Sequence, residues 1–317
     1  MCTFKTIDEQ INILKDRGLI IHNEERAKRY LLTNNYYNII NGYSKFFQDR
    51  KDHFISGATF NEIRELYWFD KEFKQVLLNG ILNAEHHLKS IAAYRFAEAY
   101  PDIKYPYLQI DNFNPNGLNH NWQLISKLSR ILSSNCTYDN NTIHHNIYSH
   151  NDVPIWVIVD YFDFGTLRTF IKSLPQNIQN KIAVDCIEFI NDNVAGFSGA
   201  FPINIMNSFI KNIHETRNIC AHNNRLLMFK CRSDSYYFQP LHSIHNIGNE
   251  SNARKDVFTT FINLQCFLSK TEYGVLNNTL RKRIKLLNHR LSSISINKIL
   301  SSLGFPDDWQ ENASLPQ

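Results

Sequence analysis

Residues 59–100 read TFNEIRELYWFDKEFKQVLLNGILNAEHHLKSIAAYRFAEAY, and this stretch decides the fold class. Thr59 is followed three residues later by Glu62, which is the capping-box pattern of a helix start. Apolar residues then recur at helical spacing from Phe60 to Tyr100, and Pro101 stops the pattern. We therefore predict one long helix over 60–100.

The composition favours helices in the rest of the chain. The 317 residues include only 11 glycines and 9 prolines, the residues that the tight turns of sheet proteins need. Hydrophobic residues make up 43% and charged residues 20%, which is typical of a chain that folds into a packed core. We predict an all-α fold, a helical bundle with additional N-terminal and C-terminal helices.

Helical patterns of ordinary length flank the long helix. Their ranges are 7–18, 24–32, 36–47, 119–133, 154–171, 178–190, 204–230, 254–269 and 275–303. Residues 135–152 are the most polar stretch, and we expect an exposed loop there. This pattern divides the chain into an N-terminal helical region (1–58), a helical core (59–235) and a C-terminal helical region (236–317).

The net charge and the cysteines limit the functions that the chain can have. The net charge of +4 permits nucleic-acid binding but does not by itself indicate it. The six cysteines include no C-x-x-C pair, as expected of reduced thiols in a cytoplasmic protein. The first ten residues do not form a signal-peptide pattern, and no run of about 18 apolar residues is present, so we expect no membrane association.

No metal or other cofactor is expected. The segment from His144 through His145 to His150 gathers histidines. It has no adjacent cysteine, however, and its spacing differs from the paired ligands of zinc sites.

A charged residue interrupts the apolar face of the helix predicted over 204–230. Its apolar positions are Met206, Phe209, Ile210, Ile213 and Cys220, spaced as on a buried face. Arg217 falls within this stripe. A buried guanidinium without a partner costs several kcal/mol, so a partner is required.

The long helix supplies a candidate partner. Glu85 lies inside its apolar stripe, and Lys89 follows one turn later. We therefore expect Glu85 and Arg217 to meet, directly or through Lys89. At this point a purely structural buried ion pair explains the pattern as well as a functional site does.

His222 changes this balance. It follows Arg217 by five residues, which on an ideal helix is a rotation of about 140°. The two side chains can share a pocket only through an interruption of the helix or across a dimer axis. The same segment also holds Asn218, Asn223, Asn224 and Arg225. Such a density of polar residues on a core helix predicts a site.

These residues resemble a known family. Arg217 to His222 fits the R-x4-6-H motif of the HEPN superfamily, and the run Arg217-Asn218-Ile219-Cys220-Ala221-His222-Asn223-Asn224-Arg225-Leu226 resembles the signature of Abi proteins of the AbiD/AbiF type. Glu85-His86-His87-Leu88-Lys89 is similar to the E-x3-K element beside HEPN sites. Further segments that resemble the family are Arg17-Gly18-Leu19, Asn35-Tyr36-Tyr37, Gly42-Tyr43, Leu66-Tyr67-Trp68-Phe69-Asp70, Pro154-Ile155-Trp156-Val157, Phe164-Gly165-Thr166-Leu167 and Gly304-Phe305-Pro306-Asp307-Asp308-Trp309.

The resemblance implies a HEPN-type helical bundle that cleaves RNA without a metal. It also implies a homodimer whose site combines two R-x4-H motifs, and a toxin that acts in abortive infection against phage. Some relatives are paired with a small noncoding RNA, which would make that RNA a second partner in a toxin–antitoxin arrangement.

The residue types suit this chemistry. Histidine can move the protons of the 2′-OH and of the leaving 5′-oxygen because its reference pKa is about 6.5. Arginine can contact two oxygens of a phosphorane. On this hypothesis Arg217, His222 and Asn218 are catalytic, and Asn218 positions the phosphate or His222. The supporting residues are Glu85, Lys89, Asn223, Asn224 and Arg225.

A basic stripe is a second candidate contact for RNA. It consists of Arg281, Lys282, Arg283, Lys285 and Arg290. Such runs either contact phosphates or form a solvated helix face. Two alternatives to the nuclease stay open from the sequence. One is a non-catalytic helical module that holds a regulatory RNA in the same pocket, and the other is a helical scaffold.

Overall fold

The computed structural model describes residues 4–222 and 224–312, and within them the fold is all-α, as predicted. The α-helices are α1 (Ile7–Asp16), α2 (Glu24–Asn34), α3 (Phe60–Ala99), α4 (Leu118–Asn135), α5 (Thr142–His150), α6 (Ile155–Ile158), α7 (Phe164–Ser173), α8 (Gln176–Asp185), α9 (Ile187–Asn193), α10 (Ile203–Ala221), α11 (Gln239–His242), α12 (Val257–Asn263), α13 (Lys270–Asn288), α14 (Ile296–Leu303) and α15 (Trp309–Asn312). Among these residues, the strands β1 (Gln48–Arg50) and β2 (His53–Phe54) form one short hairpin.

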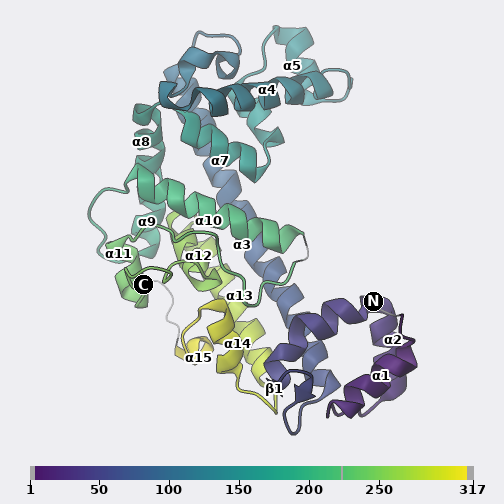
Figure 1. Cartoon of the computed structure of the whole chain (residues 1–317). Helices are drawn as coiled ribbons and strands as arrows, with labels where there is room; N and C mark the ends of the chain where they lie inside the picture. The colour runs from purple at the N-terminus through teal and green to yellow at the C-terminus, as the bar shows by residue number, and fades with distance from the viewer. Residues whose placement is uncertain (1–3, 223, 313–317) are drawn as a thin grey trace.

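Helix α3 is the axis of the molecule, with α1 and α2 at one end and α4 and α5 at the other (Figure 1). It begins as predicted: Thr59 Oγ1 accepts the backbone N–H of Glu62, and the Glu62 carboxylate accepts the N–H of Thr59 at 3.1 Å. Helix α13 packs along α3. A Cβ on Gly80 would stand 2.8 Å from Leu276 Cδ2, so the glycine permits this close approach.

Helix α10 crosses α3 and packs against α3, α7 and α12 (Figure 1). Its predicted apolar positions Met206, Phe209, Ile210 and Ile213 are fully buried. The buried apolar side chains form one continuous cluster that includes residues from 11 to 309. The three regions drawn from the sequence thus share a core, and their boundaries stay a prediction.

The N-terminal region departs from the pattern expected over 36–47. One turn of π-helix (Tyr37–Asn41) and one of 3-10 helix (Ser44–Phe47) replace a regular helix there. The β1–β2 hairpin follows, with Gln48 opposite Phe54. This hairpin was not predicted from the sequence, because its strands are too short to show an alternating pattern.

The prediction of a loop over 135–152 is wrong for half of this stretch, because α5 occupies 142–150. Asn141 caps this helix by accepting the N–H of Ile143 at 2.8 Å. Tyr161 donates its hydroxyl to the same Asn141 oxygen at 2.8 Å, and Ile143 is fully buried. A distant tyrosine and one buried isoleucine therefore stabilise a helix whose own composition is polar.

Five predicted helices are shorter or interrupted. The one expected over 254–269 is α12 followed by a turn of 3-10 helix (Leu264–Cys266). Residues 154–171 are divided between α6 and α7, because Asp163 caps a new helix by accepting the N–H of Thr166 at 2.7 Å. Residues 178–190 are divided between α8 and α9 at Cys186. Residues 275–303 are divided between α13 and α14, and the helix expected to reach Lys230 ends at Ala221. Within the described ranges, no helix has the length and apolar character needed to cross a membrane.

Candidate functional site

The candidate catalytic residues gather at the C-terminal end of α10. The backbone N–H of His222, the first residue after the helix, donates to the carbonyl of Asn218 at 3.1 Å. His222 is exposed, whereas Arg217 and Asn218 are half-buried. Arg217 is therefore at the edge of the apolar face rather than in its middle, where the sequence analysis had put it. The helix ends between Arg217 and His222. This is the interruption that, as an alternative to a dimer axis, would let the two side chains share a pocket.

A buried carboxylate fixes the chain just after this point. Asp70 of α3 is 1% exposed, and its Oδ1 accepts the backbone N–H groups of Leu226 and Leu227, each at 3.1 Å. Its Oδ2 accepts the hydroxyl of Tyr43 at 2.8 Å. The Lys74 ammonium lies 3.1 Å from Asp70 Oδ2 and donates to the carbonyl of Asn224 at 2.8 Å. These contacts hold the turn that follows α10 against α3.

Two of the predicted supporting residues serve this anchor. The carbonyl of Asn224 accepts from Lys74, and the Arg225 guanidinium donates to the carbonyl of Gly42. Both contacts stabilise the turn. They account for the side chain of Arg225, whereas Asn224 contributes only its backbone carbonyl and is otherwise exposed. Asn223, predicted beside them, lies outside the described residues.

The expected direct pair between Glu85 and Arg217 is not formed. Glu85 is 6% exposed, and its Oε1 pairs with Lys89 Nζ at 3.1 Å. Its Oε2 and the Nε of Arg217 are both buried without a hydrogen-bond partner among the described residues. The i,i+4 geometry within α3 explains the correction, because Lys89 reaches Glu85 without any tertiary packing. The Arg217 guanidinium therefore keeps unused hydrogen-bonding capacity.

The structure adds two residues that the sequence analysis missed, His214 on α10 and Arg168 on α7. The His214 ring stacks on Phe164 with ring centroids 5.6 Å apart and planes 8° apart. Arg168 Nη1 lies 3.4 Å from its Nδ1, and the Asn218 amide lies 3.2 Å from its Nε2. Burial, and next the charge of Arg168, lower the pKa of His214. In the sequence, His214 could have been found from its position four residues before Asn218, a spacing that brings two side chains together on a helix.

Hydrogen-bond chemistry sets the orientation of the Asn218 amide. Arginine only donates, so His214 Nδ1 accepts and the neutral imidazole carries its proton on Nε2. Asn218 Nδ2, which lies 3.2 Å from Nε2, would then face that N–H as a second donor. A half-turn of the amide places Oδ1 there as the acceptor, and we infer this orientation. His214 therefore uses the oxygen of Asn218 and leaves the amide NH₂ available to a ligand.

Most of the predicted basic stripe, which lies on α13 and just after its end, is paired within the protein. Arg283 pairs with Glu72 at 2.9 Å and Lys285 with Glu311 at 2.7 Å. Arg290 pairs with Glu65, and Arg281 Nε donates to the carbonyl of Gln310 at 3.1 Å. Lys282 is exposed and forms no ion pair with the described residues. Phosphate contact along this stripe stays a prediction, and it now depends mainly on Lys282.

Metal-ligating side chains do not gather in the described residues. No group of three or more His, Cys, Asp or Glu side chains in 4–222 and 224–312 is arranged to hold an ion. The candidate site itself offers arginine, histidine and amide groups, which bind anions and move protons.

These features describe an all-α protein in which arginine, asparagine and histidine side chains gather at the C-terminal end of α10. A family model described as Abi-like protein matches residues 29–228. That range is more than half of the chain, so the chain belongs to the Abi-like protein family, as the sequence resemblance indicated. It contains the Asp70 anchor and the segment from Arg217 to His222, whereas α11–α15 lie beyond it. No curated protein and no solved structure matches the chain.

Proposed function

We propose that this protein is a metal-independent endoribonuclease of the HEPN type that acts as a toxin in abortive infection. Membership in the Abi-like family supports the defence role. The observation that carries the nuclease is the arrangement at the end of α10, where the exposed His222 follows the half-buried Arg217 and Asn218 on an anchored turn.

The hydrogen-bond inventory favours a ligand over a purely structural role. The Arg225 guanidinium is used by the fold. Arg217 Nε, by contrast, is buried and unpartnered. A buried donor without a partner costs about 1–3 kcal/mol, and more when it is charged. An anionic ligand such as an RNA phosphate would remove this cost.

The mechanism uses the nucleophile that RNA itself carries. A histidine removes the proton of the 2′-OH, which then attacks the adjacent phosphorus, and the P–O5′ bond breaks. A second histidine gives a proton to the leaving 5′-oxygen. Arg217 stabilises the charge of the phosphorane, and the NH₂ of Asn218 donates to one of its oxygens. The products are a 2′,3′-cyclic phosphate and a free 5′-hydroxyl.

One chain supplies one His222, so this mechanism needs two copies. A twofold axis beside the exposed end of α10 would bring the two R-x4-H motifs together, with one His222 as base and the other as acid. We propose that a small noncoding RNA restrains this toxin in the cytoplasm until infection. Glu85 and Lys89 would then act on Arg217 through the packing of α3 rather than by direct contact.

Cleavage of a labelled RNA by purified protein tests the proposal. We expect fragments ending in 2′,3′-cyclic phosphate, full activity in EDTA, and no cleavage when the 2′-OH at the scissile position is replaced by hydrogen. His222→Ala should abolish cleavage without changing the melting temperature. If the RNA stays intact while wild type and His222→Ala bind it equally well, the protein is the non-catalytic RNA-binding module instead.

A further inference from the structure

Two arginines flank His214 where α7 meets α10. Arg168 Nη1 lies 3.4 Å from His214 Nδ1, and Arg217 follows His214 by three residues, a spacing that puts two side chains on the same side of a helix. Burial, and then the charges of Arg168 and Arg217, lower the pKa of His214. Both guanidiniums are half-buried, and neither forms an ion pair with residues 4–222 or 224–312. Two like charges beside one ring favour a bound anion.

The carboxylates near His214 do not neutralise these arginines. Asp163 and Glu215 oppose the downward shift of the His214 pKa, so they are the anionic groups within reach. Asp163, the N-cap of α7, pairs with Lys127 at 2.8 Å, and Glu215 accepts the backbone N–H of Arg232 at 2.8 Å. The junction of α7 and α10 therefore keeps positive charge that an anionic ligand can use.

The ion pair between Asp163 and Lys127 joins this junction to α4. Helix α7 packs against both α10 and α4 and lies between them (Figure 1). On α4, Lys127 and Arg130 border an open hollow of about 360 Å³, and its other lining residues are uncharged. Arg130 is exposed and forms no ion pair within the described ranges. We call Arg217, Arg168, Lys127 and Arg130 the basic path, because they follow one another from α10 over α7 to α4.

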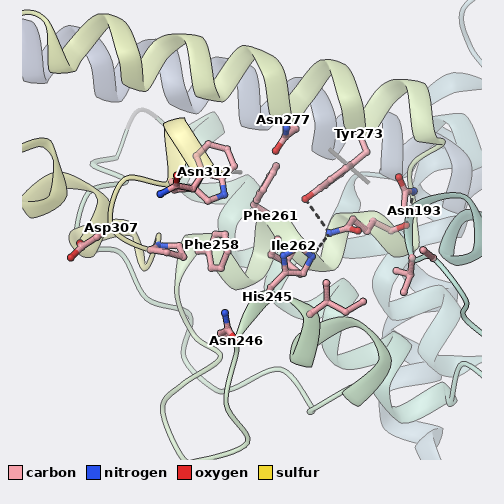
Figure 2. Close-up of a pocket in the computed structure, with 16 residues that line it drawn as sticks. Asn193, His245, Asn246, Phe258, Phe261, Ile262, Tyr273, Asn277, Asp307 and Asn312 are labelled. Atoms are coloured by element: carbon pink, nitrogen blue, oxygen red, sulfur yellow. Dashed lines mark hydrogen bonds between the residues drawn. The ribbon is translucent and has the colours of Figure 1, made fainter. Parts of the chain in front are cut away.

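The cavity between α12, α13 and α15 offers no comparable surface (Figure 2). The described residues that line it include no arginine or lysine. The ring of Phe261 lies with its centroid 5.1 Å from that of Tyr273 and 5.7 Å from that of Trp309, so these rings cover one another. Gln265 Nε2 lies 3.1 Å from both the Tyr273 hydroxyl and His245 Nε2 (Figure 2). A polyanion therefore finds counter-ions on the basic path and not in this cavity.

We propose that an RNA strand bound at the candidate catalytic site continues along the basic path, with Arg168 on the phosphate next to the scissile one and Arg130 on a phosphate farther along. This inference rests on the proposed ribonuclease, because it starts from a scissile phosphate at Arg217. A guanidinium suits both positions, since its planar fork contacts two phosphate oxygens. Phosphate contacts position a strand without reading its sequence. The substrate is therefore an RNA that extends beyond the scissile bond, and this surface adds no base specificity.

The salt dependence of RNA binding tests the path without requiring cleavage. The probe is a fluorescent single-stranded RNA of about 12 nucleotides, and every protein also carries His222→Ala so that the probe stays intact. Each lost phosphate contact should reduce the slope of log K against log salt by about 0.7. We expect this reduction, with weaker binding, from Arg168→Gln and from Arg130→Gln. Arg26→Gln, which removes an exposed arginine of α2, should change neither the slope nor the affinity.

Cleavage of a dinucleotide gives a second readout. It lacks the flanking phosphates, so wild type should cleave it with a kcat/KM at least about tenfold below that of the longer RNA. Arg168→Gln should narrow this difference by lowering only the value for the longer RNA. Glutamine keeps an NH₂ that can donate to His214, and an unchanged melting temperature checks that the junction is preserved.

The outcomes separate the path from the nuclease. Unchanged slopes in both Arg168→Gln and Arg130→Gln, with RNA cleaved by wild type, would overturn the path and leave the nuclease standing. Reduced slopes with no cleavage by wild type would support the path as an RNA-binding surface and refute the nuclease alone. Absence of RNA binding would overturn both.

Discussion

The carboxylate of Asp70 accepts the backbone N–H of Leu226 at 3.1 Å, across 156 positions of the chain. This bond joins the central helix α3 to the turn that follows the candidate catalytic segment. Tyr43 and Lys74 bind the same carboxylate, so residues from three distant parts of the sequence meet at one buried charge. Much of the family-like sequence pattern thus maintains the position of α10 rather than performing chemistry.

Loss of the Asp70 charge should destabilise the protein strongly. Asp70→Asn leaves the Lys74 ammonium, 4% exposed, without its ionic partner. We expect the free energy of unfolding to fall by about 3–5 kcal/mol, measured by urea denaturation. Asp70→Asn combined with Lys74→Met should recover part of this loss, because no buried charge remains. A single-variant loss below about 1 kcal/mol would contradict the role of the anchor.

His214 should act as a positioning residue for Asn218. We expect His214→Ala to lower the cleavage rate roughly ten- to a hundredfold, because the amide loses its fixed orientation. His214→Gln should restore much of the rate, since its oxygen can accept from Arg168 and its NH₂ can donate to Asn218. Equal rates for the alanine and glutamine variants would show that the orientation of Asn218 does not matter.

The structure also predicts acid sensitivity. His242 is fully buried; its Nδ1 accepts the N–H of Phe238 at 3.1 Å and its Nε2 lies 2.8 Å from Asn263 Oδ1. Burial lowers its pKa from 6.5 to about 4. Near pH 6 the unfolded chain therefore binds a proton at His242, whereas the folded chain does not. The free energy of unfolding consequently decreases as the pH falls below 6.5.

When the pH falls from 7 to 5, protonation of His242 in the unfolded chain should lower the free energy of unfolding by roughly 2 kcal/mol. His242→Gln can form both hydrogen bonds without titrating, so its stability should fall less over the same interval. The measurement is urea denaturation of both proteins at the two pH values. Parallel losses in wild type and variant would assign the acid sensitivity to other groups.

Mixing experiments test whether the catalytic site needs two copies. Equal amounts of wild type and His222→Ala, unfolded and refolded together, should give about one quarter of the activity of wild type alone, since only wild-type homodimers carry both histidines. Activity of about one half would mean that each chain works by itself. Arg232→Ala changes an exposed arginine and should leave the activity of the mixture unchanged.

The sequence predicted what local interactions determine. Thr59, Glu62 and the apolar stripe of α3 lie within one helix, so the helix was predicted almost to the residue. The end of α10 was misplaced because no glycine or proline stops it there, and the Asp70 anchor redirects the chain through long-range contacts. Helix α5 was missed because Tyr161 and the core stabilise its start.

The residues of the candidate site were also predicted only in part. Arg217, Asn218 and His222 occur together in the sequence and were found by their density. The contact between Arg168 and His214 requires the packing of α7 on α10, which no spacing along the chain reveals. Glu85 was assigned a tertiary partner, whereas Lys89 on the same helix was already within reach.

Induced expression in cells tests the central claim most directly. Wild type, Arg217→Ala and His222→Ala are compared for growth and for the integrity of total RNA, with Arg232→Ala and His289→Ala, two exposed positions, as matched controls and with soluble protein checked in each culture. We predict growth arrest and RNA fragments with wild type and both controls, and neither with Arg217→Ala or His222→Ala. RNA fragmentation that persists in His222→Ala, or growth arrest by wild type with intact RNA both before and during phage infection, would contradict a nuclease centred on these two residues.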